Sequence, residues 1–189
     1  MRILALAAAF SLASTATFAA EIYTLDASHS QVVFSYNHLG FSTTYGMFSG
    51  FEGEISYDET DPAASSVSVS MPVKSMFTGW EARDIQFMSP DFFSAEDGDM
   101  VTFNSTLIEV TGDTTALITG DLSMNDITKS VVLDAKLNKN DTHPVLGKPW
   151  LGFDATTTLL RSDFGLGAFA PVISDAVEVR ISIEAQKVE

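Results

Sequence analysis

Apolar and polar residues alternate along most of this chain. Residues 177–185 place Val, Ile and Ala at odd positions and Glu, Arg and Ser at even positions. Side chains of a strand point alternately to its two faces, so this pattern predicts antiparallel strands with one buried and one solvent-facing side. The same period of two runs through residues 32–38, 67–73, 116–124, 131–137 and 151–159.

Clusters of Asp, Asn, Gly and Pro separate these runs and predict turns between the strands. They occur at residues 58–62, 112–113, 125–126 and 138–141. The apolar parity slips between Phe103 and Ile108, and again beside Gly50. A slip of one residue indicates a β-bulge or a strong bend at each place.

One stretch, residues 78–93, lacks the alternation and predicts a short helix. Thr78 is its expected N-cap, with Glu81 at the capping-box spacing, and Pro90 ends it. About eight strands in one domain are typical of a barrel or a sandwich. The 14 Phe, many of them on the inward parity, favour a barrel with an interior to line. The fold expected is all-β: an eight-stranded antiparallel barrel with a short helical insertion.

The first 19 residues have the composition of a secretory signal peptide. Arg2 is the only early charge, an apolar run follows it, and small residues at Thr17 and Ala19 favour cleavage after Ala19. We expect residues 20–189 to form a single exported domain, most simply in a periplasm. A signal anchor is the competing interpretation, although the apolar run is shorter than the ~20 residues of a membrane-spanning helix. No later segment has the length and apolar character of such a helix.

Composition argues against several classes of function. The chain has 25 Asp and Glu against 10 Lys and Arg, for a net charge of −15. Nucleic acid and anionic lipid surfaces are poor partners, because both are bound through Lys and Arg. The absence of Cys excludes disulfides, a thiolate nucleophile and Cys-ligated zinc. There is no GxSxG or P-loop motif, and the GxGxxA run at residues 165–170 precedes Pro171 in no βαβ unit.

The three histidines, His29, His38 and His143, have no spacing typical of a metal site, so we expect no bound metal. His38 is the most informative, because it shares the inward parity of Phe34 and Tyr36. Two interpretations remain open for it. It is either a hydrogen-bonded residue at the mouth of the barrel or a residue with a ligand-binding or catalytic role.

Two charged pairs stand among aromatic residues: Arg83 with Asp84, and Arg161 with Asp163. In an acidic chain with few Arg, such residues are expected to be paired. One interpretation is that these pairs are salt bridges that pin the helical insertion and the last loop to the barrel end. The other is that the two Arg side chains hold the polar head of a ligand at the mouth.

A set of short motifs runs through the chain in a consistent order. It comprises YTLDASHS at 23–30, the Phe34–His38 segment, GMF at 46–48, FEG at 51–53, RD at 83–84, DFF at 91–93, VTF at 101–103, GDL at 120–122, TK at 128–129, GF at 152–153, RSDFG at 161–165 and the closing strand 177–185. In these motifs the chain resembles the YceI-like family of lipid-binding, lipocalin-like secreted proteins. One departure is Gln86, at a position that is often His in the family; the next residue, often Leu, is Phe87.

The resemblance implies a lipocalin-like barrel around a long apolar channel, with a long-chain isoprenoid lipid as its ligand. Such a ligand is a polyprenyl phosphate, an isoprenoid quinone or another long-chain amphiphile, and no other cofactor is expected. The channel-lining and mouth residues expected are Phe34, Tyr36, His38, Phe48, Phe51, Val69, Met71, Arg83, Phe92, Phe103, Phe153, Arg161 and Phe164.

The function expected is therefore periplasmic binding, transport or sequestration of that lipid, without catalysis and without stable insertion into a membrane. The first alternative is a periplasmic enzyme acting on lipid or isoprenoid substrates. The second is a barrel filled by its own side chains that acts through its surface. The chain is also compatible with a homodimer.

Overall fold

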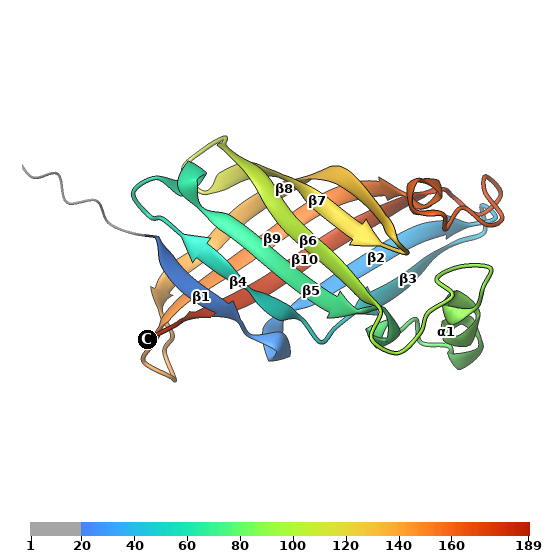
Figure 1. Cartoon of the computed structure of the whole chain (residues 1–189), viewed down its shortest axis with the longest axis horizontal. Coiled ribbons are helices and arrows are strands. Elements are labelled where there is room, and N and C mark those ends of the chain that lie inside the picture. The colour runs from blue at the N-terminus through green and yellow to red at the C-terminus, as the bar shows by residue number, and fades with distance from the viewer. Residues whose placement is uncertain (1–19) are drawn as a thin grey trace, which may run out of the picture.

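The computed structural model describes residues 20–189, so the expected signal peptide lies outside the described residues. Ten strand segments form one antiparallel sheet that curls around an elongated interior (Figure 1). The strands are β1 (Glu21–Leu25), β2 (Gln31–His38), β3 (Ser42–Phe48), β4 (Glu52–Tyr57), β5 (Ser66–Pro72), β6 (Met100–Val110), β7 (Thr115–Met124), β8 (Ile127–Thr142), β9 (Pro149–Leu160) and β10 (Ala176–Lys187). The helical elements are α1 (Glu81–Met88) and the 3-10 turns η1 (Ala27–His29), η2 (Pro62–Ala64), η3 (Val73–Ser75) and η4 (Arg161–Phe164).

The sheet closes as an eight-stranded barrel. Its order runs β1-β4-β5-β6-β7-β8-β9-β10, and β10 pairs back with β1. β1 and β2 are two parts of one strand position, because β10 pairs with β1 through Ala185 and with β2 through Val179. The turn η1 interrupts them, and a break at Gly50, with a φ of 69°, separates β3 from β4 in the same way. The expected eight-stranded antiparallel barrel is confirmed.

A gap in the barrel wall lies between β3 and β5. Among the described residues, β3 pairs along its length only with β2, and it meets residue Phe77 in a single bridge at Met47. Residues 73–99, which contain η3 and α1, lie beside one end of the barrel (Figure 1). We call this end, with the β2–β3 turn and the β9–β10 loop, the mouth.

The structure confirms most of the predicted strand boundaries. The parity slip after Phe103 is a register shift between Ser105 and Leu107 in the β6–β7 pairing. The predicted turn at 138–141 is wrong, because β8 continues to Thr142 and still pairs Asp141 with Trp150. A second register shift, between residues 137 and 139, accommodates Asn138 within the strand. The chain reverses at residues 143–148 instead.

The predicted helix exists, but its N-cap is different. α1 begins at Glu81 after Trp80, which makes no side-chain capping bond. Thr78 lies two residues earlier, where its N–H and hydroxyl both donate to the carboxylate of Asp84. The capping box expected at Thr78 is therefore wrong. Within residues 20–189, no helix has the length and apolar character needed to cross a membrane.

Candidate functional site

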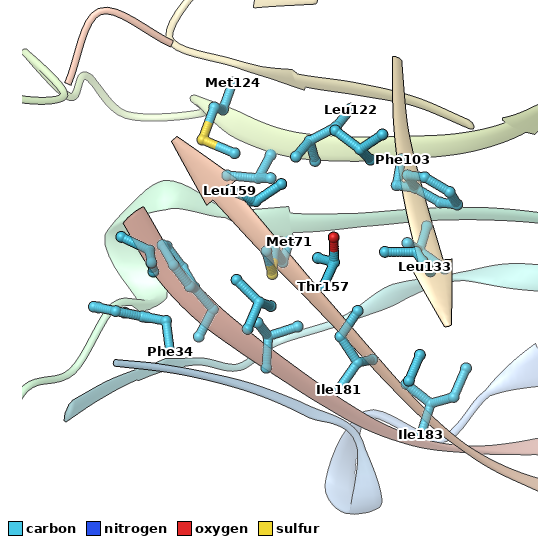
Figure 2. A pocket seen from close by; sticks show the side chains of 18 of the residues that line it. Phe34, Met71, Phe103, Leu122, Met124, Leu133, Thr157, Leu159, Ile181 and Ile183 are labelled. Atoms are coloured by element: carbon cyan, nitrogen blue, oxygen red, sulfur yellow. The ribbon is translucent and has the colours of Figure 1, made fainter. Parts of the chain in front are cut away.

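The interior of the barrel contains a cavity of about 790 Å³. This volume is within the range of sites that enclose a small molecule or a lipid chain. Its wall is built from the inward-facing side chains of the strands, so the alternation read in the sequence is the direct cause of its apolar character. Figure 2 shows these side chains pointing into the interior, with the hydroxyl of Thr157 among carbon and sulfur atoms.

The cavity extends over most of the length of the barrel. At the mouth its lining includes His38 and Arg83, and at the opposite end it includes Pro62 and Asp113 in the β4–β5 and β6–β7 connections. A cavity with these two limits accommodates an extended chain better than a compact ligand, because its long direction follows the barrel axis. Several middle lining residues, among them Met71, are only partly buried because they face this space.

All thirteen residues expected at the site line the cavity: Phe34, Tyr36, His38, Phe48, Phe51, Val69, Met71, Arg83, Phe92, Phe103, Phe153, Arg161 and Phe164. Their exposure differs. Phe164 is 2% exposed and Phe51 is 4% exposed, so these two pack mainly against protein. Phe153 and Met71 retain more accessible surface toward the cavity.

A series of aromatic rings leads from the interior to the mouth. The ring of Tyr36 on β2 meets Phe87 of α1 at a centroid distance of 6.3 Å. Phe87 meets Phe92 at 5.1 Å, and Phe92 meets Phe169 of the β9–β10 loop at 6.2 Å. These edge-to-face and tilted contacts are the favourable geometries for aromatic pairs. They attach the insertion and the last loop to the barrel wall.

Two glycines shape the wall where phenylalanine rings lie flat against it. The ring of Phe34 covers Gly46, its cross-strand partner on β3, and a β-carbon there would collide with the ring. The ring of Phe103 covers Gly120 on β7 in the same way. A larger residue at either glycine would push the ring toward the centre of the cavity.

Arg161 organises the β9–β10 loop. Its Nε donates to the carbonyl of Ser174, its Nη1 to Leu166 and Ala168, and its Nη2 to Ile173. Four of its five N–H groups are therefore directed to backbone oxygens of its own loop. Burial lowers the pKa of Arg161, and the nearby carboxylate of Asp175 opposes that change.

The expected salt bridge of Arg161 with Asp163 is therefore absent from the ion pairs of residues 20–189. The physical reason is that the guanidinium is directed to carbonyls. Asp175 instead accepts hydrogen bonds from the backbone N–H and hydroxyl of Ser162. These bonds hold its pKa below the ordinary value, with the Ser162 hydroxyl as the largest cause. The loop is pinned as expected, but by hydrogen bonds.

Arg83 and Asp84 fix the start of the insertion through a shared partner. Arg83 donates from Nε to the hydroxyl of Thr78 and from Nη2 to its carbonyl, while Asp84 accepts from Thr78. The expected direct salt bridge of this pair is replaced by these contacts with buried Thr78. The guanidinium carbon of Arg83 lies 5.8 Å from the Trp80 ring centroid, and three of its N–H groups are left for solvent or a ligand.

The histidines do not converge. His38 lies at the mouth, where its backbone bridges to Ile173. His143 is in the β8–β9 turn at the opposite end, where its Nδ1 accepts from the N–H groups of residues 145 and 146. His29 lies in η1, with its Nδ1 2.6 Å from Asp26 Oδ2. The side-chain carboxylate of Glu184 lies close to both groups. The Glu184 carboxylate also accepts from Trp150 Nε1 at 2.7 Å.

The sequence interpretation missed the outer part of the mouth. Leu39, Trp80, Phe169 and Val172 line the cavity and are also strongly exposed. They lie in turns and loops, where no alternation marks a residue as inward-facing. The only available signal was the presence of large apolar residues beside turn-forming Gly40, Gly79 and Pro171.

Comparison with known proteins identifies the family. The profile of the YceI-like domain matches residues 23–185, which is most of the chain. The chain belongs to the YceI-like family. A UPF0312 protein of Ectopseudomonas mendocina is 40% identical to this YceI-like protein over 156 residues, which cover 82% of this chain and 81% of that protein.

Solved structures share the YceI-like barrel. BcnA of Burkholderia cenocepacia superposes with a TM-score of 0.76 at 21% identity, covering 85% of this chain and 98% of BcnA. A polyisoprenoid-binding domain from Saccharophagus degradans, implicated in plant cell wall breakdown, superposes with a TM-score of 0.68 at 14% identity, covering 88% of this chain and 98% of that domain. At these identities the two structures establish the fold. The resemblance drawn from the motifs is confirmed.

The departure from the YceI-like pattern lies at the mouth. Gln86 is exposed on α1 and contributes to the cavity lining. Glutamine keeps hydrogen-bonding groups at this position but, unlike histidine, does not titrate. Phe87, the next residue, makes the ring contacts with Tyr36 and Phe92 that hold α1 in place.

Proposed function

We propose that the protein binds one long-chain isoprenoid lipid in its barrel and carries or sequesters it in a periplasm. The observation that carries this proposal is the apolar cavity that extends from the mouth to the opposite end of the barrel. The similarity in fold to a polyisoprenoid-binding domain supports the choice of ligand. The predicted signal peptide at residues 1–19 supports the choice of compartment.

The binding energy comes from removing an alkyl chain from water. Each buried CH₂ contributes about 0.8 kcal/mol, so an isoprenoid gains affinity with every unit that enters the cavity. Part of this energy is offset by lost translational and chain freedom. Affinity is therefore expected to rise with chain length until the cavity is full and then to remain constant.

The polar end of the lipid is expected at the mouth, near His38 and Arg83. Arg161 directs four N–H groups to its own loop, so Arg83 is the better donor for a headgroup. The net charge of −15 opposes the approach of an anion. This arrangement favours a neutral head, such as that of a quinone, over a phosphate.

The described residues favour binding over catalysis. Ser28, His29 and Asp26 lie close together in η1, but Ser28 Oγ and Asp26 Oδ2 both contact Nδ1 of His29. A nucleophile–base–carboxylate relay uses both ring nitrogens of the histidine, one for each partner. This group also lies apart from the residues that line the cavity.

Mass spectrometry of an organic extract tests the proposal directly. Protein purified from its native source without detergent should yield a long-chain isoprenoid at close to one molecule per chain. A titration with prenyl alcohols of increasing length should then show the rise and plateau in affinity. An extract free of isoprenoid, together with affinity independent of chain length, would contradict the proposal. Conversion of the bound lipid during the assay would support the enzyme alternative.

A further inference from the structure

Exposed aromatic side chains gather at the mouth. Among residues 20–189, those with large exposure are Phe41, Tyr45, Phe77, Trp80 and Phe169. Phe41 is the most exposed of them, at 89%. All five belong to three segments, residues 39–47, 76–80 and 166–174, which we call the rim. The exposed apolar residues at the opposite end, such as Val145 and Leu146, are aliphatic.

Hydrogen bonds join the three rim segments into one surface. The N–H of Leu39 donates to the carbonyl of Val172 at 3.1 Å, which ties the β2–β3 turn to the β9–β10 loop. Met47 and Phe77 exchange two backbone hydrogen bonds of 2.9 Å, which tie β3 to the insertion. In Figure 1 the β2–β3 turn, the β9–β10 loop and α1 lie at the same end of the barrel.

The rim lacks charge in a strongly charged chain. None of its three segments contains Asp, Glu, Lys or Arg, although the chain has 35 such residues in total. Segments that expose many aromatic side chains and contain no charged residue are unusual where a protein meets only water, and exposed apolar patches commonly mark interaction sites.

The rim is continuous with the cavity. Leu39, Trp80, Phe169 and Val172 belong to both, since they are exposed to solvent and also line the interior. The ring series from Phe169 through Phe92 continues this apolar surface inward. A lipid chain that enters here would stay in contact with apolar side chains throughout its path.

We propose that the rim docks on the surface of a lipid bilayer with uncharged or zwitterionic headgroups, from which the ligand enters the barrel. This inference rests on the proposed function, because only a lipid ligand has to leave a bilayer. Trp, Tyr and Phe side chains are favoured at membrane interfaces, where their rings lie at the level of the headgroups. The acidic chain would be repelled by anionic headgroups. The rim segments contain no Lys or Arg, and the guanidinium of Arg83, 5.8 Å from the Trp80 ring centroid, is a neighbouring cation outside them.

The fluorescence of the two tryptophans can report on docking at each end of the barrel. Trp80 lies on the rim, and Trp150 lies at the opposite end, where its Nε1 donates a hydrogen bond to Glu184. The variant Trp150→Phe leaves Trp80 as the sole tryptophan, and Trp80→Phe leaves Trp150. With phosphatidylcholine vesicles that contain no isoprenoid, emission of the Trp80-only protein should shift to shorter wavelength. Emission of the Trp150-only protein should not shift.

Sedimentation with the same vesicles measures the contribution of the rim. The double variant Phe41→Ser/Val172→Ser should lower the vesicle partition coefficient by about tenfold or more, because two exposed apolar side chains lose their contact with the bilayer. The matched control, Val145→Ser/Leu146→Ser, removes two exposed apolar side chains from the opposite end and should leave partition unchanged. All four altered side chains are more than half exposed, so both variants are expected to fold.

Three results would overturn the inference. They are protein that stays in the supernatant with vesicles, equal loss of partition in both double variants, and a concentration-dependent dimer that shields Trp80 without vesicles. The last result would assign the rim to a second copy of the chain. Prenyl alcohol binding in vesicle-free solution is measured in parallel. If it persists, only the docking inference fails; if it is absent, the proposed function fails as well.

Discussion

Replacing Arg161 by Ala should destabilise the barrel end that forms the mouth. The side chain donates four hydrogen bonds to carbonyls of residues 166–174. A hydrogen bond that involves a charged group contributes about 1.5–3 kcal/mol of net stability. Simple addition over four bonds would approach the entire stability of a typical domain, which is about 5–15 kcal/mol.

The expected loss is smaller than that sum, because the variant loop can move and let water reach some of the carbonyls. We expect Arg161→Ala to cost about 3–5 kcal/mol, roughly the contribution of two of the four bonds. For a chain of this size, 1 kcal/mol changes the melting temperature by about 2–4 °C. The melting temperature should therefore fall by about 6–20 °C.

Urea unfolding followed by circular dichroism measures this loss directly. Arg180→Ala is the matched control, because Arg180 is exposed on β10 and takes part in no ion pair among the described residues. Arg161→Lys should be intermediate, since lysine keeps the charge but lacks the planar arrangement of five donors. If Arg161→Ala and Arg180→Ala differed by less than about 0.5 kcal/mol, the assigned role of Arg161 would be refuted.

Three further predictions concern the lining and the titrating groups. Phe153→Asp should unfold the barrel or abolish lipid uptake, because it places an unpaired carboxylate in the cavity wall. Asp154→Asn, on the exposed side of β9, should change stability and lipid uptake little. Similar melting curves and lipid binding for both variants would contradict the assigned inward and outward faces of β9. The hydrogen bond with Asp26 raises the pKa of His29. The pair therefore stabilises the fold below pH ~6.5 and loses this contribution as the pH rises through the folded-state pKa of His29. The difference in melting temperature between the native chain and His29→Asn should shrink from pH 6 to pH 9. Burial raises the pKa of Tyr23 to about 12, so a spectrophotometric titration should lose its most alkaline step in Tyr23→Phe.

The lining of the barrel was predictable because it depends on strand period alone. The odd residues of β10, from Val177 to Ile183, line the cavity or its core as the alternation requires. Phe34 and Tyr36 on β2 do the same. In an antiparallel barrel one face of each strand is buried, so the position of one apolar residue determines which face every other residue of the strand occupies. A pattern of five residues is therefore enough to assign the inward-facing side chains.

Side-chain hydrogen bonds at the mouth were not predictable, since they depend on contacts between loops. Thr78 and Glu81 have the spacing of a capping box, yet Thr78 pairs with Asp84 because the insertion turns before α1 begins. The segment at 138–141 has the composition of a turn, yet the long pairing of β8 with β9 carries it through as strand. In both places a tertiary contact overrides a local preference.

The same alternation is compatible with a filled barrel and with a hollow one, and burial distinguishes them. At the end of the barrel where β1 begins and β10 ends, the interior is packed: Leu151 and Ala185 are 0% exposed, and Tyr23 is 3% exposed. In the middle, Val69 and Ile181 face the cavity and remain only partly buried. Side chains that border a cavity make fewer dispersion contacts than they would in a packed core. A chain-shaped ligand would restore those contacts, so it should raise the melting temperature with increasing concentration. The melting temperature at increasing lipid concentration would therefore measure lipid binding in the middle of the barrel.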